Sequence, residues 1–215
     1  MRIFPIRFLI SISLTCLNFS CNQYRHMQKI QSDESCLQKF KPDFNHVIYK
    51  TSVDVFGKHI SGLLIMKFMP DSSTRVVFSN EMGFSFFDFG FLPDSGFKVY
   101  QIVPQMNKKG LIKTLRKDFE LVMFRNMDVS RYFALKDSNL IYHAFPQNKG
   151  VNYYITESLC RQLIKMQRAS NKKPVMEAFM EGGSLGIAPD SISIRHFNFS
   201  HFSITLKKIS PLAPE

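Results

Sequence analysis

The chain has 215 residues, of which 45% are hydrophobic, and its formal net charge at pH 7 is +11. This length is enough for one domain with a substantial core, and it excludes a small scaffold that depends on disulfides or metals for stability. The surplus of positive charge favours an anionic membrane surface, a nucleic acid or an acidic partner.

Residues 1–20 have the layout of a secretory signal. Arg2 and Arg7 form a short positive region, and an apolar stretch follows from Phe8 to Phe19, which is too short to be identified as a membrane span. Loss of this segment leaves about 195 residues and lowers the formal charge from +11 to +9. Export makes nucleic acid the least expected partner of such a basic chain.

Ser20-Cys21 directly follows the apolar stretch. A small residue before a cysteine at this point resembles the lipobox of bacterial lipoproteins, in which the cysteine becomes the lipidated first residue. We therefore expect a lipid anchor on Cys21. The alternative is ordinary signal cleavage near Ser20, which leaves Cys21 as a plain thiol. Residues 21–43 are polar, and we expect a lipid-anchored tether with a short helix or coil around residues 37–40.

Cys36 and Cys160 are the cysteines that remain once the signal and the anchor are set aside. In an oxidising compartment they can form a disulfide that ties the N-terminal segment to the second half of the domain. Two buried free thiols are an equally good interpretation. The sequence has no CxxC and no HExxH, and its histidines are scattered, so we expect no metal site.

The first half of the domain reads as a β-meander. Period-two patterns begin at His46, and turn-forming residues separate them. Short gaps between successive strands indicate antiparallel neighbours. The expected strands cover residues 47–55, 59–68, 74–79, 84–91 and 97–102.

A change of period marks one helix over residues 108–124. Leu111, Leu115 and Phe119 belong to an apolar stripe at helical spacing, and charged residues fall mainly on the other side. Asn107 is the expected N-cap. An amphipathic helix of this kind needs a sheet to cover.

Strands resume after the helix and continue to the end of the domain. We expect a single domain over residues 44–210 and a tail over 211–215. The expected strands cover residues 131–135, 140–145, 151–156, 159–167 and 174–180, followed by a closing hairpin that begins at residue 191 and returns through residues 202–210.

The stretch Phe84–Phe91, FSFFDFGF, carries aromatic groups on both faces of its strand. A sheet with one wet face alternates more cleanly, so this strand is either covered on both sides or faces a cavity. Solid packing is the plain alternative, since aromatic residues dominate ordinary cores. The abundance of Phe and Met favours a cavity that accepts flexible acyl chains. The residues that we expect to line this cavity are Leu63, Ile65, Val77, Phe87, Phe89, Phe91, Leu115 and Phe119.

The organisation resembles the bacterial lipoprotein localisation factors LolA and LolB. The resemblance rests on Gly62-Leu63-Leu64-Ile65, Arg75-Val76-Val77-Phe78, the helix from Leu111 and the closing hairpin with Ile192 and Ile204. It implies a mainly β (α+β) fold: an open, strongly curved antiparallel half-barrel with a helical lid. It also implies a monomer anchored to the outer membrane, facing the periplasm, that binds lipid or lipoprotein acyl chains and needs no cofactor.

Two other functions compete with lipid binding. A scaffold lipoprotein could dock an envelope partner through the basic helix face, which carries Lys108, Lys109, Lys113, Arg116 and Lys117. An enzyme is the weakest candidate, and we expect no catalytic residues. His143, His196 and His201 lack a nucleophile motif, and Asp88 is expected to pair across the sheet or cap a turn rather than act as an acid or base.

Overall fold

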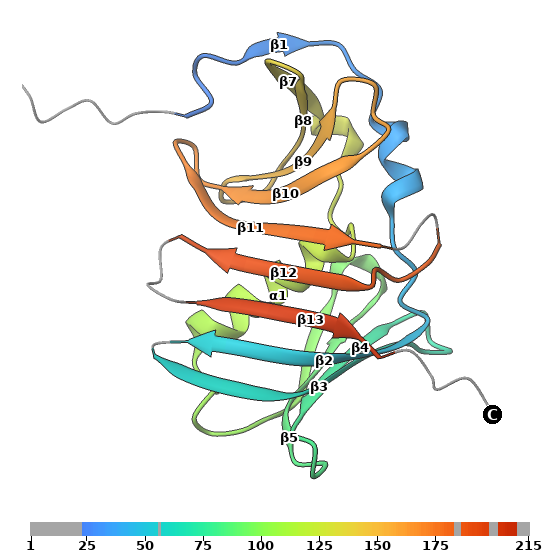
Figure 1. The fold of residues 1–215 in the computed structure, drawn as a ribbon, viewed down its shortest axis with the longest axis vertical. Coiled ribbons are helices and arrows are strands. Elements are labelled where there is room, and N and C mark those ends of the chain that lie inside the picture. Colours follow the sequence, from blue (N-terminus) through green and yellow to red (C-terminus); the bar gives the residue numbers. More distant parts are fainter. Residues whose placement is uncertain (1–22, 56, 183–185, 198–201, 210–215) are drawn as a thin grey trace, which may run out of the picture.

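The computed structural model describes residues 23–55, 57–182, 186–197 and 202–209 (Figure 1). The predicted signal, Cys21, His201 and the tail at 211–215 lie outside the described residues. No helix among the described residues combines the length and apolar character needed to cross a bilayer. The strands are β1 (Gln28–Ile30), β2 (His46–Val55), β3 (Lys58–Phe68), β4 (Thr74–Ser79), β5 (Ser85–Phe91), β6 (Phe97–Ile102), β7 (Phe133–Asp137), β8 (Leu140–Pro146), β9 (Val151–Glu157), β10 (Leu163–Ala169), β11 (Pro174–Glu181), β12 (Ser191–His196) and β13 (Ser203–Lys208). The helices are η2 (Glu34–Phe40), η3 (Pro93–Ser95), α1 (Lys109–Val122) and η4 (Val129–Arg131).

The strands form one antiparallel sheet of 13 strands in the order β1-β7-β8-β9-β10-β11-β12-β13-β2-β3-β4-β5-β6. β1 and β6 are its two edges, so the sheet stays open. The last strand, β13, pairs with β2 and joins the two meanders at the centre of the sheet. The prediction of a mainly β, antiparallel fold is confirmed.

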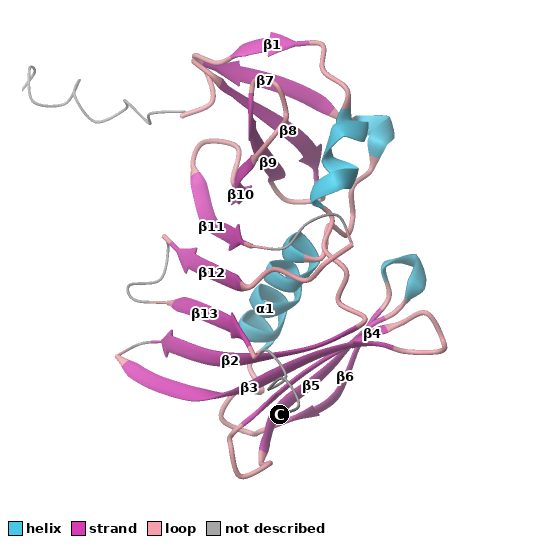
Figure 2. Ribbon diagram, turned by 45° about the vertical axis from the view of Figure 1, so that its right-hand side comes forward, coloured by secondary structure: helices cyan, strands magenta, loops and turns pink. Residues whose placement is uncertain are grey.

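The sheet is curved, and α1 lies in its concave side (Figure 2). In Figure 2, β11, β12, β13 and β2 lie beside the helix, β7–β9 lie above it, and β4–β6 lie below it and to the right. One main core lies between α1 and the sheet, and Phe78, Phe119, Tyr154 and Ile194 are among its buried members. α1 thus occupies the position that its apolar stripe predicted.

Two predicted boundaries differ from the structure. β10 begins at Leu163 rather than at residue 159, because residues 158–162 form a turn in which Cys160 has a positive φ of 51°. Asn107 does not cap α1: the N-cap is Lys108, and its side chain makes no capping hydrogen bond. The first turn of α1 is therefore held by packing rather than by a side-chain cap.

The N-terminal segment is part of the fold: the short helix expected around residues 37–40 is present as η2, while residues 28–30 form a strand where a tether was expected. β1 extends the sheet by pairing with β7. Tyr24 and Met27 are buried in a second, smaller cluster with Tyr142, Tyr153 and other residues of β8–β10. Along each strand, the residues of this cluster alternate with the residues that face α1. The cluster therefore lies on the outer face of the sheet.

Candidate functional site

A cavity of about 670 Å³ lies between the N-terminal half of α1 and the inner face of the sheet. Its walls come from β2, β3, β13 and the ends of β4 and β5, and the loop before α1 closes one side. The lining residues are Thr51, Val53, Val55, Lys58, Ile60, Leu64, Phe78, Phe87, Gln105, Met106, Lys108, Gly110, Leu111, Lys113, Thr114, Leu115, Phe119, Phe202 and Ile204.

The pleat of the strands explains why the wall is apolar. In β2 the residues that face α1 include Tyr49, Thr51 and Val53, while Lys50 and Asp54 point outwards and are exposed. Thr51 is the buried polar exception, and its hydroxyl donates a hydrogen bond to the Tyr49 carbonyl oxygen at 3.1 Å. The Thr51 hydroxyl therefore has a hydrogen-bond partner within the protein and needs none from a ligand.

Three of the predicted cavity residues line the cavity: Phe87, Leu115 and Phe119. Phe89 and Phe91 share the inner face with Phe87 but do not reach the cavity wall. Both are fully buried, and each packs edge-on against Phe97 with ring centroids 5.3 Å apart. The aromatic stretch therefore supplies both a cavity wall and a solid core beside it.

The remaining predictions, Leu63, Ile65 and Val77, are wrong. These residues are half-buried, and their neighbours Leu64, Met66 and Val76 are the ones buried on the inner face. Ile65 is in register with Val77, so the three lie on the outer face. Successive residues of a strand point to opposite faces of the sheet. In a run of apolar residues, the sequence does not indicate which of them point inwards.

The sequence interpretation also missed part of the wall. Val53 and Ile60 face each other across β2 and β3, and the cavity is also lined by Ile204 of β13 and by Phe202 just before that strand. For β2 the signal was present, because exposed Lys50 and Asp54 alternate with the inward residues. For β13 the decisive fact is its pairing with β2, which no local pattern encodes.

The mouth of the cavity is basic. Lys58, Lys108 and Lys113 are exposed side chains among the lining residues, and none of the described lining residues is acidic. An apolar interior with a positively charged mouth suits an amphipathic ligand whose polar end is neutral or anionic.

A buried group of charges fixes α1 to the sheet. Asp118 of α1 is fully buried, and His196 Nε2 of β12 lies 2.8 Å from its Oδ2. The guanidinium of Arg168, from β10, approaches the other oxygen at 2.7 Å as an ion pair without the alignment of a hydrogen bond. Removal of one partner leaves a buried charge uncompensated, so this contact holds the helix over the cavity.

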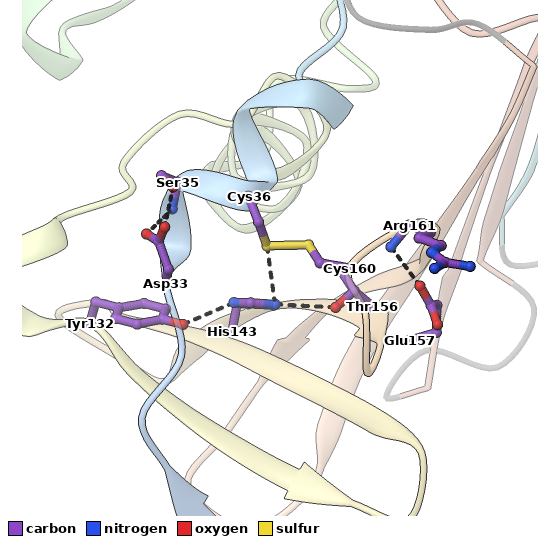
Figure 3. Close-up of a disulfide and its surroundings, with 9 residues drawn as sticks. All are labelled: Asp33, Ser35, Cys36, Tyr132, His143, Thr156, Glu157, Cys160 and Arg161. Carbon is purple, nitrogen blue, oxygen red and sulfur yellow. Dashed lines mark hydrogen bonds between the residues drawn. A yellow bond between two sulfur atoms is a disulfide. The ribbon is translucent and has the colours of Figure 1, made fainter.

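Cys36 and Cys160 form a disulfide that joins η2 to the β9–β10 turn (Figure 3). His143 lies beneath it, with Nε2 3.9 Å from the Cys36 sulfur and 3.2 Å from Thr156 Oγ1. Its Nδ1 is 2.9 Å from the Tyr132 hydroxyl. Burial lowers the pKa of His143 to about 4, and nearby Asp33 partly opposes this shift.

The two sulfurs and the His143 ring present donor atoms within 4.8 Å of one another, a grouping that the sequence interpretation missed. Soft metals are bound by thiolates, and a disulfide offers none. When the disulfide is formed, this group therefore has a structural role: it attaches the N-terminal segment to the sheet.

Asp88 lies on the outer face, away from the cavity. Its Oδ1 accepts a hydrogen bond from Arg75 Nε at 2.8 Å, and a second contact joins Arg75 Nη2 to Oδ2. The Arg75 guanidinium stacks over Tyr100, 3.7 Å from the ring centroid. The structure thus gives Asp88 the cross-sheet partner that was expected for it.

No family model matches the sequence. No curated protein matches it either. A solved structure of a DUF1329 family protein from Desulfovibrio piger matches with 11% sequence identity and a TM-score of 0.39, covering 79% of this chain and 88% of that one. A likeness with a score this low carries no conclusion about function.

Proposed function

We propose that this protein is a non-enzymatic lipoprotein of the bacterial cell envelope that binds acyl chains, free or attached to a protein, beneath α1. The observation that carries the proposal is the apolar cavity of about 670 Å³. Ligand sites commonly have volumes of about 300–1,000 Å³ and mostly apolar walls. Twelve of the 19 lining residues are Val, Ile, Leu, Phe or Met, which suits a hydrocarbon chain better than a polar metabolite.

The resemblance to LolA and LolB supports the same function. An open, curved antiparallel sheet with a helix on its concave side is the architecture that the resemblance implied. Together with the lipobox-like Ser20-Cys21, it supports a monomer anchored to the outer membrane, facing the periplasm, that takes part in lipid or lipoprotein trafficking.

The scaffold alternative has weaker support. Part of the basic helix face is already engaged within the protein, because Arg116 pairs with Glu120 at 2.7 Å and also donates to the Ser95 carbonyl oxygen. The exposed Lys108 and Lys113 lie at the cavity mouth. Their position is explained by a ligand that enters the cavity.

Lipid analysis of the purified full chain is the direct test. Native mass spectrometry and organic extraction should detect co-purifying lipid in stoichiometric amount. A chain that carries no lipid and takes up no fatty acid on titration would end the proposal.

A tryptophan reporter locates the ligand. The chain contains no tryptophan, so Phe87→Trp places a unique fluorophore in the cavity wall. A brominated fatty acid should quench this fluorophore with saturation. Val77→Trp, on the outer face of neighbouring β4, is the matched control and should stay unquenched. Equal quenching of the two would place the ligand elsewhere.

A blocking substitution completes the test. Val53→Phe adds bulk to the cavity, and Val77→Phe adds the same bulk to the outer face. Only the first should weaken fatty acid binding, by tenfold or more, with both variants folded by circular dichroism. Unchanged binding by Val53→Phe would count against this cavity.

A further inference from the structure

A second hollow, a groove of about 1050 Å³, lies at the same end of the strands as the cavity mouth. The β8–β9 turn and the β10–β11 turn form two of its walls, and α1 contributes Lys117. The cationic side chains that line it are Lys117, Lys149, Arg168, Lys172 and Lys173.

The charge in this groove is largely uncompensated. None of the described residues that line it is acidic, and only Arg168 has an ion-pair partner, the buried Asp118. Within the part of the chain that the structure describes, no carboxylate lies within 4.0 Å of Lys117, Lys149, Lys172 or Lys173. Four neighbouring lysines without counter-charges favour an anionic ligand.

The surroundings of Lys117 disfavour the charged form of its side chain. Its side chain is half-buried, and burial followed by the charges of Arg168 and Lys113 lowers its pKa, with partial opposition from Glu120. A bound anion would relieve that repulsion. Lys149, Lys172 and Lys173 are exposed and line the same groove as half-buried Lys117.

The proposed lipid anchor leaves the fold beside this groove. The backbone N–H of Gln23 donates to the carbonyl oxygen of Lys172 at 2.9 Å. Cys21 is two residues before Gln23, a separation that the chain can span by at most about 7 Å. A lipid on Cys21 would therefore hold a membrane close to Lys172.

We infer that the groove formed by Lys117, Lys149, Lys172 and Lys173 binds the anionic phosphate groups of lipid heads in the membrane that holds the anchor. This inference rests on the proposed anchor at Cys21, but not on occupancy of the cavity. Lysine ammonium groups are effective point-charge partners of phosphate.

The groove also places the cavity relative to that membrane. Lys113 lines the cavity and Lys117 lines the groove, and four residues of helix separate them by about 6 Å along its axis. A bilayer seated on the groove would lie next to the cavity mouth. An acyl chain could then pass between membrane and cavity with little exposure to water.

Vesicle binding tests the inference, with the full chain carrying Cys21→Ser so that no lipid anchor is attached. Vesicles of phosphatidylcholine with about 30% phosphatidylglycerol are titrated against the parent, against Lys149→Gln/Lys172→Gln/Lys173→Gln, and against Lys50→Gln/Lys67→Gln/Lys207→Gln. The control removes the same charge from exposed lysines on the outer face of β2, β3 and β13. Each lysine near an anionic surface strengthens binding roughly fivefold, so the groove variant should lose about a hundredfold and the control far less.

Two results would overturn the inference: no vesicle binding by the parent, or equal losses in the two variants. A parent that binds pyrophosphate but no vesicles would have a site for soluble anions instead. The Phe87→Trp reporter, introduced into the groove variant, keeps the two proposals separate. Quenching by brominated fatty acid should persist there, since the cavity is untouched. Loss of quenching in every background would refute the cavity and leave the groove result standing.

Discussion

The cavity half of the sheet (β2–β5 and β13, under the N-terminal half of α1) and the sealed half (β1 and β7–β10 with η2) are built from similar strands but filled differently. In the cavity half, the inner face borders about 670 Å³ of space. In the sealed half, Phe145 and Tyr154 pack together on the inner face, and Tyr24 and Met27 cover the outer one. One continuous sheet is thus solid at one end and hollow at the other.

The difference shows where each half obtains its stability. The sealed half has two packed faces, a disulfide and a buried histidine with polar partners on both ring nitrogens. The cavity half has one packed face and depends on α1 being held in place by Asp118. Disruption of contacts in the sealed half should therefore lower stability alone. Disruption of the contacts that hold α1 over the cavity half should lower both stability and ligand affinity.

Removal of the disulfide should have the largest effect. The double variant Cys36→Ser/Cys160→Ser releases a loop of 124 residues, and the chain-entropy model gives a loss of up to about 5 kcal/mol in the free energy of unfolding. Urea denaturation followed by circular dichroism measures this loss. Fatty acid binding below the transition should persist, because the cavity lies in the other half. A loss under about 1 kcal/mol would show that the sealed half does not rely on this bond.

Loss of the Asp118 carboxylate comes next. Asp118→Ala leaves Arg168 without its buried counter-charge, which should cost about 3–5 kcal/mol and loosen α1. Both urea stability and fatty acid affinity should fall. Asp128→Asn, at an exposed pair with Arg131, is the control and should change neither. A variant that lost stability but kept full affinity would mean that α1 does not hold the cavity closed.

The third effect depends on pH. The pKa of His143 is about 4 in the folded protein and about 6.5 in the unfolded chain. Between these two pH values the unfolded chain binds a proton on His143 and the folded protein does not. Stability should therefore be complete above pH 6.5 and decline by about 3 kcal/mol as the pH falls to 4. Denaturation at a series of pH values measures the slope.

His143→Gln should flatten that slope, while His46→Gln, at an exposed position of β2, should leave it unchanged. A parent protein equally stable at pH 7 and pH 4.5 would contradict the neutral, buried state of His143.

The smallest expected effect concerns the outer face of the cavity half. Asp88→Asn weakens the partly buried pair with Arg75 and should cost about 1 kcal/mol. Fatty acid affinity should stay the same, because the pair points away from the cavity. A large loss of affinity with the fold intact would give Asp88 a role in ligand binding that its position does not suggest.

Much of the fold could be predicted from local signals. Turn residues separated the strands, so the predicted ranges of β4 and β6 coincide with those observed. The helical period located α1 between the two meanders. In the N-terminal segment the short helix was predicted but β1 was not, because β1 has three residues and gains its structure only by pairing with β7.

The site was harder to predict because it depends on the phase of each strand and on distant pairings. Leu63 and Leu64 are chemically equivalent in a run without polar residues, yet only Leu64 faces the cavity. The groove depends on two turns that become neighbours only when β9 pairs with β10. No local pattern contains either fact.

The pairing of β13 with β2 has a consequence for biogenesis. Leu206 lies opposite Thr51, so the centre of the sheet joins the first long strand of the domain to the last. Contacts this far apart along the chain form slowly. Until the final strand is in place, β2 lacks one of its two partners, and the hollow beneath α1 lacks one wall. A chain that stops short of β13 would thus expose an unpaired strand edge and apolar side chains on which other chains can aggregate.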